Sequence, residues 1–257
     1  KWFPDRRGLA TGMAIMGFGF ASFLGAPIIN ELIGHFGISR TFYSMAGVYL
    51  VVMTVSALYL APPPKDWALN HAPYFKVKSQ IRRQADLMPM NANDAVRTWP
   101  FYGLWVMMFI NITCGIAIIS VASPMIQEMT GVTPLVAAAV VGLNGLFNGG
   151  GRLGWATVSD WIGRPLTFII FFILQIGCFL LLASVADIFI YQVVLYIIMA
   201  CYGGGFATLP AYIGDIFGTR QVSAIHGYVL TAWALAGISG ASLAAVVRES
   251  TGSYSSM

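Results

Sequence analysis

The sequence predicts an all-α protein, a polytopic bundle of membrane-spanning helices, from its hydrophobicity, its few charges and the length of its apolar runs. Of its 257 residues, 58% are hydrophobic and 9% are charged, and the mean hydropathy is +0.75. Soluble domains carry about 25% charged residues. Several runs of about 20 apolar residues are long enough to cross the hydrocarbon core of a bilayer. These observations exclude a water-soluble fold.

The apolar runs predict seven spans with one long polar interruption. In chain order we expect the spans at about 9–29, 41–61, 100–121, 133–155, 165–185, 188–213 and 223–247. Residues 62–99 are polar and carry six Lys and Arg residues, which is typical of a linker between two helical bundles. We therefore divide the chain into the end of a first helical half (1–61), a central linker (62–99) and a second half (100–257).

Lysine and arginine are distributed unevenly across the predicted membrane. Twelve of the 14 lie on the side of the N-terminal segment and the linker, and only Arg40 and Arg248 lie on the other side. Because cytoplasmic loops are enriched in Lys and Arg, we expect the N-terminal segment and the linker to be cytoplasmic. The net charge of +4 lies almost entirely between the spans, so it does not indicate nucleic-acid binding.

A short internal repeat indicates two parallel halves. The segment 3–6, with Gly12 after it, resembles the segment 217–220, with Gly227 after it. Six expected spans separate the two copies, so both copies cross the membrane in the same direction. This arrangement is typical of two six-helix halves related by an axis normal to the membrane. The chain would then hold the fifth to the eleventh of twelve helices, and we expect it to be a fragment.

Asn144, Asn148 and Arg152 lie four residues apart in the fourth expected span and form one polar stripe. Arg152 precedes Asp160 by eight residues, which places it about 12 Å into the helix from the membrane edge. An arginine inside the membrane is costly and is by default a functional candidate. Its guanidinium group matches a carboxylate with two parallel hydrogen bonds. The alternative is that Arg152 reaches the interface or pairs with a helix end.

Charged residues and glycines follow the stripe at the cytoplasmic side. Gly154, Asp160, Gly163 and Arg164 occupy the end of the fourth span and the next turn. Glycine permits left-handed backbone there, and the two charged side chains can bond each other or nearby helix ends. Asp215 and Arg220 precede the last span on the same side. We expect these charges to form contacts that break and reform during function.

Glycine-dense helix faces are a further feature of the spans. We expect close, sliding helix contacts around Gly17, Gly25, Gly149 and Gly204. Small residues allow membrane helices to approach closely.

The pattern Gly154-x5-Asp160-x2-Gly163-Arg164 resembles the loop signature of the major facilitator superfamily. Together with 1–10, 146–152 and 215–219 it is similar to the oxalate/formate antiporter family within that superfamily. The resemblance implies a major facilitator superfamily fold of two six-helix halves, here truncated to about seven spans. It also implies exchange of small carboxylates across the bacterial inner membrane.

The resemblance further implies which side chains meet the substrate. Arg152 would bind the carboxylate, and four aromatic residues would line the central cavity. They are Phe18, Tyr202, Phe206 and Trp233. Dicarboxylate-carrying members of the family have a lysine in the eleventh helix, whereas 223–247 contains neither Lys nor Arg and has Trp233 at that position. Because an unpaired second carboxylate is costly in a low dielectric, the sequence favours a monocarboxylate such as formate, lactate or pyruvate.

We therefore expect a monomeric secondary transporter in the lipid bilayer that works by alternating access. It would carry a small carboxylate anion, with a counter-transported anion or a proton as the coupled species. An oxalate-type dicarboxylate exchanger is an alternative, and so is a seven-helix receptor or photoreceptor. The receptor would need an external N-terminus, and a photoreceptor a lysine in its last span. We expect no catalytic residues, cofactor, metal or nucleic-acid partner, because no metal-ligand or nucleophile–base spacing occurs.

Overall fold

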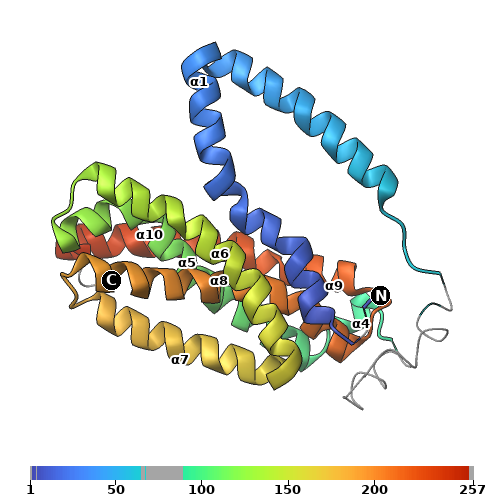
Figure 1. The fold of residues 1–257 in the computed structure, drawn as a ribbon. Coiled ribbons are helices and arrows are strands. Elements are labelled where there is room, and N and C mark those ends of the chain that lie inside the picture. The colour runs from blue at the N-terminus through green and yellow to red at the C-terminus, as the bar shows by residue number, and fades with distance from the viewer. Residues whose placement is uncertain (1, 4, 65–66, 68–88, 255–257) are drawn as a thin grey trace.

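The structure is a computed structural model that describes residues 2–3, 5–64, 67 and 89–254, and its regular secondary structure in those ranges is helical (Figure 1). The helices are α1 Arg7–Tyr59, α4 Ala92–Ala95, α5 Trp99–Thr130, α6 Pro134–Ile162, α7 Arg164–Leu182, α8 Ile188–Phe217, α9 Val222–Val229 and α10 Thr231–Thr251. Six of the described helical segments are long and apolar enough to span a membrane, with α9 and α10 counted as one. The predicted all-α membrane bundle is confirmed. Most of the predicted linker, 65–66 and 68–88, lies outside the described residues.

Proline and glycine set the helix ends in the second part of the chain. Proline occupies the first turn of α5, α6 and α7, where its missing N–H costs nothing. The last residues of α5, α6 and α8 are followed by Gly131, Gly163 and Gly218, each with positive φ. The helices α5 and α6 extend beyond the spans predicted at 100–121 and 133–155, because a helix continues past the apolar run until such a residue stops it.

The two N-terminal spans are joined differently from our prediction. We expected spans at 9–29 and 41–61 with a polar turn between them, but α1 is helical throughout except at Gly37, with φ 73° and ψ 169°. Glycine alone adopts this backbone without strain. The break folds α1 into two arms, 7–36 and 38–59 (Figure 1). Because α1 continues through this break, Phe23–Tyr59 counts as one candidate span, and six spans are found where seven were expected. Pro27 lies within the first arm and does not close it.

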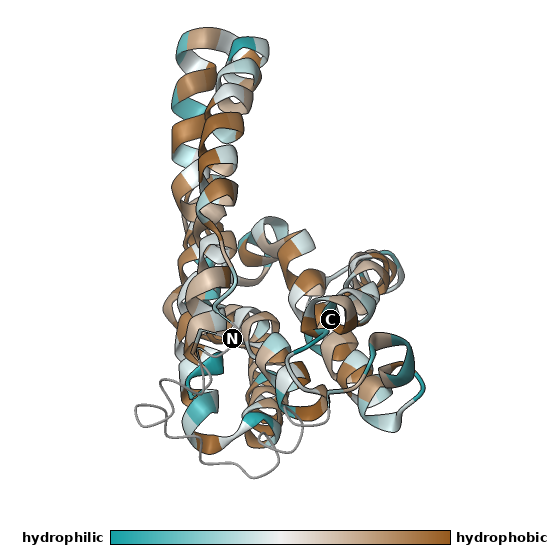
Figure 2. Ribbon diagram, turned by 90° about the vertical axis from the view of Figure 1, so that its right-hand side faces the viewer, coloured by the Kyte–Doolittle hydropathy of each residue, from teal (hydrophilic) through white to brown (hydrophobic). Residues whose placement is uncertain are grey.

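The two arms of α1 have different surroundings. The start of the first arm packs along α6 and α8, whereas the second arm stands clear of the bundle (Figure 1). Figure 2 shows apolar residues along both arms and polar residues at the bend. Nearly all described side chains of the second arm are exposed. Such an apolar surface is suited to lipid or to further membrane helices.

The last predicted span, 223–247, is divided into two helices. α9 ends at Val229, and α10 begins at Thr231 after Leu230. The Thr231 hydroxyl donates to the Tyr228 carbonyl across this junction at 2.8 Å. The two helices together still form one candidate membrane span.

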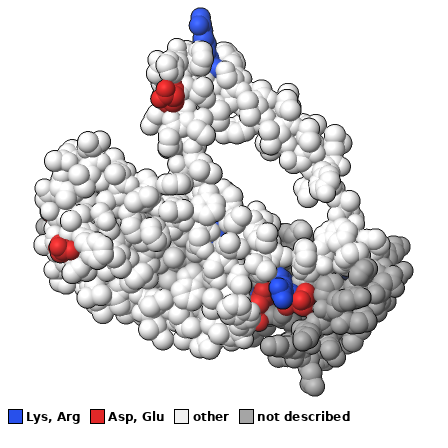
Figure 3. Space-filling view, in the orientation of Figure 1, with Lys and Arg blue, Asp and Glu red and all other residues white. Residues whose placement is uncertain are grey.

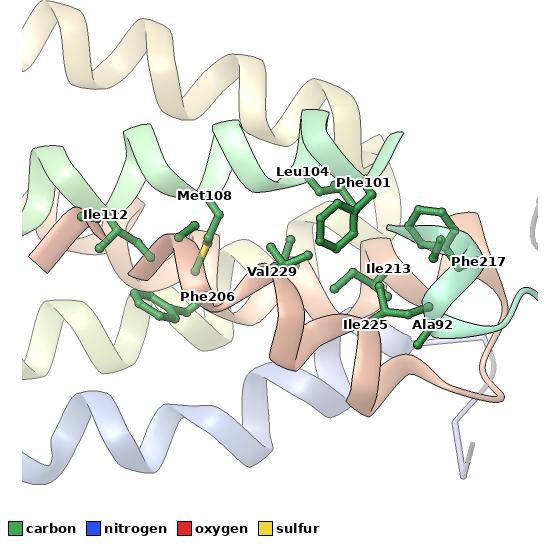
Figure 4. Close-up of a cluster of buried hydrophobic side chains, with 14 of the residues drawn as sticks. Ala92, Phe101, Leu104, Met108, Ile112, Phe206, Ile213, Phe217, Ile225 and Val229 are labelled. Carbon is green, nitrogen blue, oxygen red and sulfur yellow. The ribbon is translucent and has the colours of Figure 1, made fainter. Parts of the chain in front are cut away.

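A buried apolar cluster joins α5 to α8, α9 and α10. Figure 4 shows its members between these helices: Phe101, Leu104, Met108 and Ile112 of α5, with Phe206, Ile213, Phe217, Ile225, Val229 and Ala92. The short helix α4 enters this cluster through Ala92 and Ala95. Two hydrogen bonds fix it: the Met90 N–H donates to the Phe217 carbonyl at 3.0 Å, and the Ala92 N–H to Gln221 Oε1 at 2.6 Å. The end of the linker is thus part of the bundle.

Charged side chains gather at the ends of the helices. On the face shown in Figure 3 they cluster where α1 begins and at its bend, and the middle of the bundle is nearly free of them. We call the region of Arg7, Asp160, Arg164 and Asp215 the charged end, and the region of Glu128 and Arg248 the opposite end.

Glycine brings α1 close to α6 near the charged end. A Cβ at Gly8 would overlap the Ala156 carbonyl, and one at Gly19 would overlap the backbone of Gly149. No described atom lies within 4 Å of a Cβ built at Gly17 or Gly25. The prediction of close contacts around those two glycines is therefore wrong for the described residues, because Gly17 and Gly25 lie on other faces of α1.

Candidate functional site

Arg152 is a buried cation in the middle of α6. Only 1% of its surface is exposed, so it does not reach the interface. Its Nε donates to Asn148 Oδ1 at 3.0 Å, one turn earlier in the same helix. Its Nη2 has no hydrogen-bond partner among the described residues. No described carboxylate pairs with it either; the ion pairs of the described acidic side chains lie elsewhere.

Two aromatic rings contact this guanidinium. Its Cζ lies 4.9 Å from the centroid of Phe18 on α1 and 4.9 Å from that of Phe206 on α8. Trp233 of α10 packs against both rings, with centroids 6.1 Å from Phe18 and 5.3 Å from Phe206. Tyr202 packs against Phe206, with ring centroids 5.3 Å apart. We call these four residues the aromatic cage.

The arrangement determines where an anion could approach Arg152. Phe18 and Phe206 contact the guanidinium, and Asn148 accepts from Nε. Nη2 has no partner among the described residues, so it is the nitrogen left to donate to a carboxylate oxygen. Cation–π contacts of this kind stabilise a desolvated arginine by about 2 kcal/mol or more. The rings and Asn148 therefore hold the cation in place, and the donor capacity of Nη2 is left for a ligand.

The polar stripe of α6 has two parts in the structure. Asn148 accepts a hydrogen bond from Arg152. Asn144 lies two turns from Arg152, and no hydrogen bond joins its side chain to Asn148 or Arg152. The Asn144 side chain is buried, and its Oδ1 has no partner among the described residues. The predicted binding residues are thus brought together around Arg152, except for Asn144.

Arg164 is the centre of a second polar cluster, at the charged end. Its side chain is 2% exposed and donates from three nitrogens. Nη2 donates to Asp160 Oδ1 at 2.5 Å, Nε donates to Asp215 Oδ2 at 3.2 Å, and Nη1 donates to Ser159 Oγ. Gly163, with φ 91°, turns the chain between α6 and α7 and lets Arg164 face Asp160. The pairing of these charges agrees with the contacts expected from the sequence.

The same cluster holds the start of α1. The Asp160 carboxylate accepts from the backbone N–H groups of Gly8 at 3.0 Å and Leu9 at 2.9 Å. These amides lie in the first helical turn, where N–H groups lack helical partners and favour negative charge. Arg7 donates from Nη1 to Asp215 Oδ1 at 3.2 Å. We call Arg7, Asp160, Arg164 and Asp215 the ionic network; it links α1 to α6, α7 and α8.

Three of the four network residues, Asp160, Arg164 and Asp215, were predicted from the sequence, but Arg7 was not. The sequence feature that could have indicated Arg7 is the pair Arg6-Arg7 just before a span, on the same side of the membrane as Asp160 and Asp215. Arg220, which was predicted to take part, is exposed and pairs with none of the described acidic residues. No described atom lies within 4 Å of a Cβ built at Gly154, so nothing in its surroundings requires glycine. Within the described residues no group of three His, Cys, Asp or Glu side chains could hold a metal ion.

Comparisons with known proteins agree with this architecture. The chain is 28% identical over 255 residues to the oxalate:formate antiporter of Oxalobacter formigenes, covering 98% of this chain and 58% of that protein. It is 24% identical to the uncharacterized MFS-type transporter YhjX of Escherichia coli strain K12, covering 93% and 57%. It is 21% identical to the apicoplast pyruvate carrier 1 of Toxoplasma gondii, covering 89% and 51%.

The chain thus spans little more than half the length of these relatives. The family model of the Major Facilitator Superfamily matches residues 1–241, which include both arms of α1 and all of α5 to α9. The two N-terminal arms, the long interruption and the bundle as far as residue 241, inside α10, fall within this match. The chain therefore belongs to the major facilitator superfamily.

Proposed function

We propose that the chain is part of a secondary transporter that moves a small organic anion, a monocarboxylate such as formate, lactate or pyruvate, across a bacterial inner membrane. The observation that carries this proposal is the buried Arg152, held in the aromatic cage, whose Nη2 bonds no residue that the structure describes. The names of two relatives, an oxalate:formate antiporter and a pyruvate carrier, support a carboxylate ligand.

The charge of Arg152 gives the physical reason. A cation removed from water costs several kcal/mol unless an anion or hydrogen bonds compensate it. The amide oxygen of Asn148 and two aromatic faces supply part of this compensation, but no described carboxylate completes it. A transported carboxylate would complete it. Such a ligand binds where it neutralises the site and leaves when the site opens to water.

The geometry favours one carboxylate over two. Among the described residues, Arg152 is the only cation in contact with the cage. Trp233, which packs against Phe18, stands where the resemblance implies a lysine in dicarboxylate carriers. A second carboxylate on the ligand would meet aromatic carbon and lose its hydration without a partner. A small monocarboxylate places its apolar part against the rings instead.

Alternating access accounts for the ionic network. α1 belongs to the first predicted half, and α6, α7 and α8 belong to the second, so the network would hold the two halves together at the charged end. Opening of that end would break these contacts while a closure formed elsewhere. The excess of Lys and Arg favours the cytoplasm for this side. Exchange with a second anion and coupling to a proton are both compatible with the site.

The test is uptake of radiolabelled formate, lactate, pyruvate and oxalate by the full-length protein in proteoliposomes, with and without a pH gradient. Arg152→Gln is expected to abolish uptake of every transported anion while the protein remains monodisperse. Arg40→Gln, which changes an exposed arginine at the bend of α1, is the matched control and should transport normally. Normal uptake by Arg152→Gln would overturn the proposal.

Oxalate exchange is the second candidate, because the name of the relative from Oxalobacter includes oxalate. The same panel distinguishes it, since an oxalate exchanger takes up oxalate in preference to formate and pyruvate. Trp233→Lys would place a second cation beside the cage. We expect this variant to gain oxalate uptake relative to formate, and an unchanged ratio would contradict the one-cation argument.

A further inference from the structure

The glycine triplet Gly203, Gly204 and Gly205 of α8 lies between the cage residues Tyr202 and Phe206. Each of its glycines receives a side chain from another helix. A Cβ at Gly203 would overlap Asn148 of α6, a Cβ at Gly204 would lie 2.8 Å from atoms of Trp155 and Phe171, and a Cβ at Gly205 would overlap the amide nitrogen of Asn111 of α5. The triplet therefore serves close packing.

Asn111 makes the contact that points to a role in the site. Its side chain is fully buried, and its Nδ2 lies over Gly205 and donates to the Tyr202 carbonyl at 3.4 Å. That carbonyl belongs to the backbone of a cage residue. The ring of Tyr202 lies against α5 at Gly115, where a Cβ would overlap it. α5 thus holds both the backbone and the ring of Tyr202.

Gln175 of α7 holds Asn111 in turn. Its Nε2 donates to Asn111 Oδ1 at 3.1 Å, and its side chain is 2% exposed. The oxygen of Asn111 is therefore fixed by α7, which directs its nitrogen to α8. Two buried amides in an otherwise apolar three-helix junction are costly unless they bond each other and the backbone. They specify one register of α8 against α5 and α7.

The register matters because it places two sides of the cage. Phe206 lies one turn after Tyr202, and it contacts the Arg152 guanidinium. Asn148, which bonds Nε of Arg152, is seated on Gly203 of the same triplet. A shift of α8 would therefore move Phe206 and, at the same time, Gly203, against which Asn148 packs.

We propose that Asn111, held by Gln175 and seated on Gly205, is a positioning residue that fixes Tyr202 and Phe206 of α8 around Arg152. This inference rests on the proposed role of Arg152 as the anion anchor. Asn111 and Gln175 do not touch the guanidinium, so they act through α8. Their loss should weaken anion binding and leave the rate of the transport cycle nearly unchanged.

The experiment uses the full-length protein in proteoliposomes with [14C]formate and [14C]pyruvate as probes. Asn111→Ala and Gly205→Ala are each expected to raise KM about tenfold, the size of one lost buried hydrogen bond, with little change in Vmax. The double variant Asn111→Ala with Gly205→Ala is expected to match Asn111→Ala alone, because the three atoms nearest to the added methyl all belong to the Asn111 side chain. Gly177→Ala is the control, since no described atom lies within 4 Å of a Cβ there.

Gln175→Met keeps the side-chain volume and removes the hydrogen bond from Gln175 to Asn111. It therefore tests the positioning of Asn111 without creating a cavity, and it replaces Asn111→Ala if that variant does not fold. A KM raised in these variants with Vmax retained supports the inference. A wild-type KM in these variants, or an equal rise of KM in the Gly177→Ala control, overturns it. Arg152→Gln separates this result from the proposed function: normal uptake by that variant refutes the anchor itself, whereas a wild-type KM in Gln175→Met refutes only the positioning.

Discussion

Both ends of the bundle carry ion pairs, but the pairs at the two ends connect different helices. At the charged end the side chains of Arg164 and Asp160 are 2% and 5% exposed, and the network joins α1 to α6, α7 and α8. At the opposite end Arg248 of α10 meets Glu128 of α5 at 2.5 Å, with 41% and 27% of these side chains exposed. One network crosses between the predicted halves, and the other stays within the second half.

The partners at the opposite end explain its different character. Glu128 also accepts from the Ser253 hydroxyl at 2.7 Å and from the Tyr254 N–H at 2.8 Å, and Arg248 lies 4.7 Å from the Tyr254 ring. These contacts attach the end of α10 and the residues that follow it to α5. Partly exposed pairs of this kind are screened by water and contribute little to stability. Buried charges that lose a partner are costly, so the charged end is the one able to control a conformational equilibrium.

The largest effect is expected from Asp215→Asn. Arg7 and Arg164 both donate to this carboxylate, so the change breaks buried ion pairs at a cost of about 3 kcal/mol. The closed form of the charged end should lose population by about two orders of magnitude. Spin labels at the exposed positions 6 and 220 would report this opening as a longer distance in double electron–electron resonance. An unchanged distance, with transport intact, would show that the network is no gate.

A smaller effect is expected from Arg7→Gln. In this variant Asp215 still pairs with Arg164, and Asp160 still accepts from the first amides of α1. Only the ion pair between Arg7 and Asp215 is lost. The closed form should be weakened by about 1.5 kcal/mol, or roughly tenfold. The same pair of labels measures it, and the opening should fall between those of the wild type and Asp215→Asn. An opening equal to that of Asp215→Asn would assign the whole effect to α1.

The smallest effect is expected from Glu128→Gln at the opposite end. The amide oxygen can still accept from Ser253 and Tyr254, and the lost ion pair is partly exposed. We expect a change of less than about 1 kcal/mol in stability and no change in uptake. Thermal unfolding in detergent and proteoliposome uptake check both. A loss of transport similar to that of Asp215→Asn would remove the distinction between the ends.

Single segments show how much of the fold the sequence determined. Apolar runs of sufficient length can only be buried in lipid or in other helices, so the all-α membrane bundle followed from composition and spacing. Proline gave the starts of α5, α6 and α7 to within one residue, whereas α5 and α6 end at 130 and 162, well past the ends predicted at 121 and 155. Arg152 also stood out, because a charge within an apolar run has few structural explanations.

Tertiary structure decided what each of these residues meets. Hydropathy shows that a helix is buried but not which face meets which neighbour, so the sequence singled out Gly17 and Gly25, whereas Gly8 and Gly19 make the close contacts. The break in α1 lies at Gly37, where φ is positive, although Gly34 in the same stretch is helical. The pairing of Asp160 with the amides of α1, and the enclosure of Arg152 by rings from α1 and α8, join residues far apart in sequence. Such contacts depend on how the helices pack, and local sequence does not specify that packing.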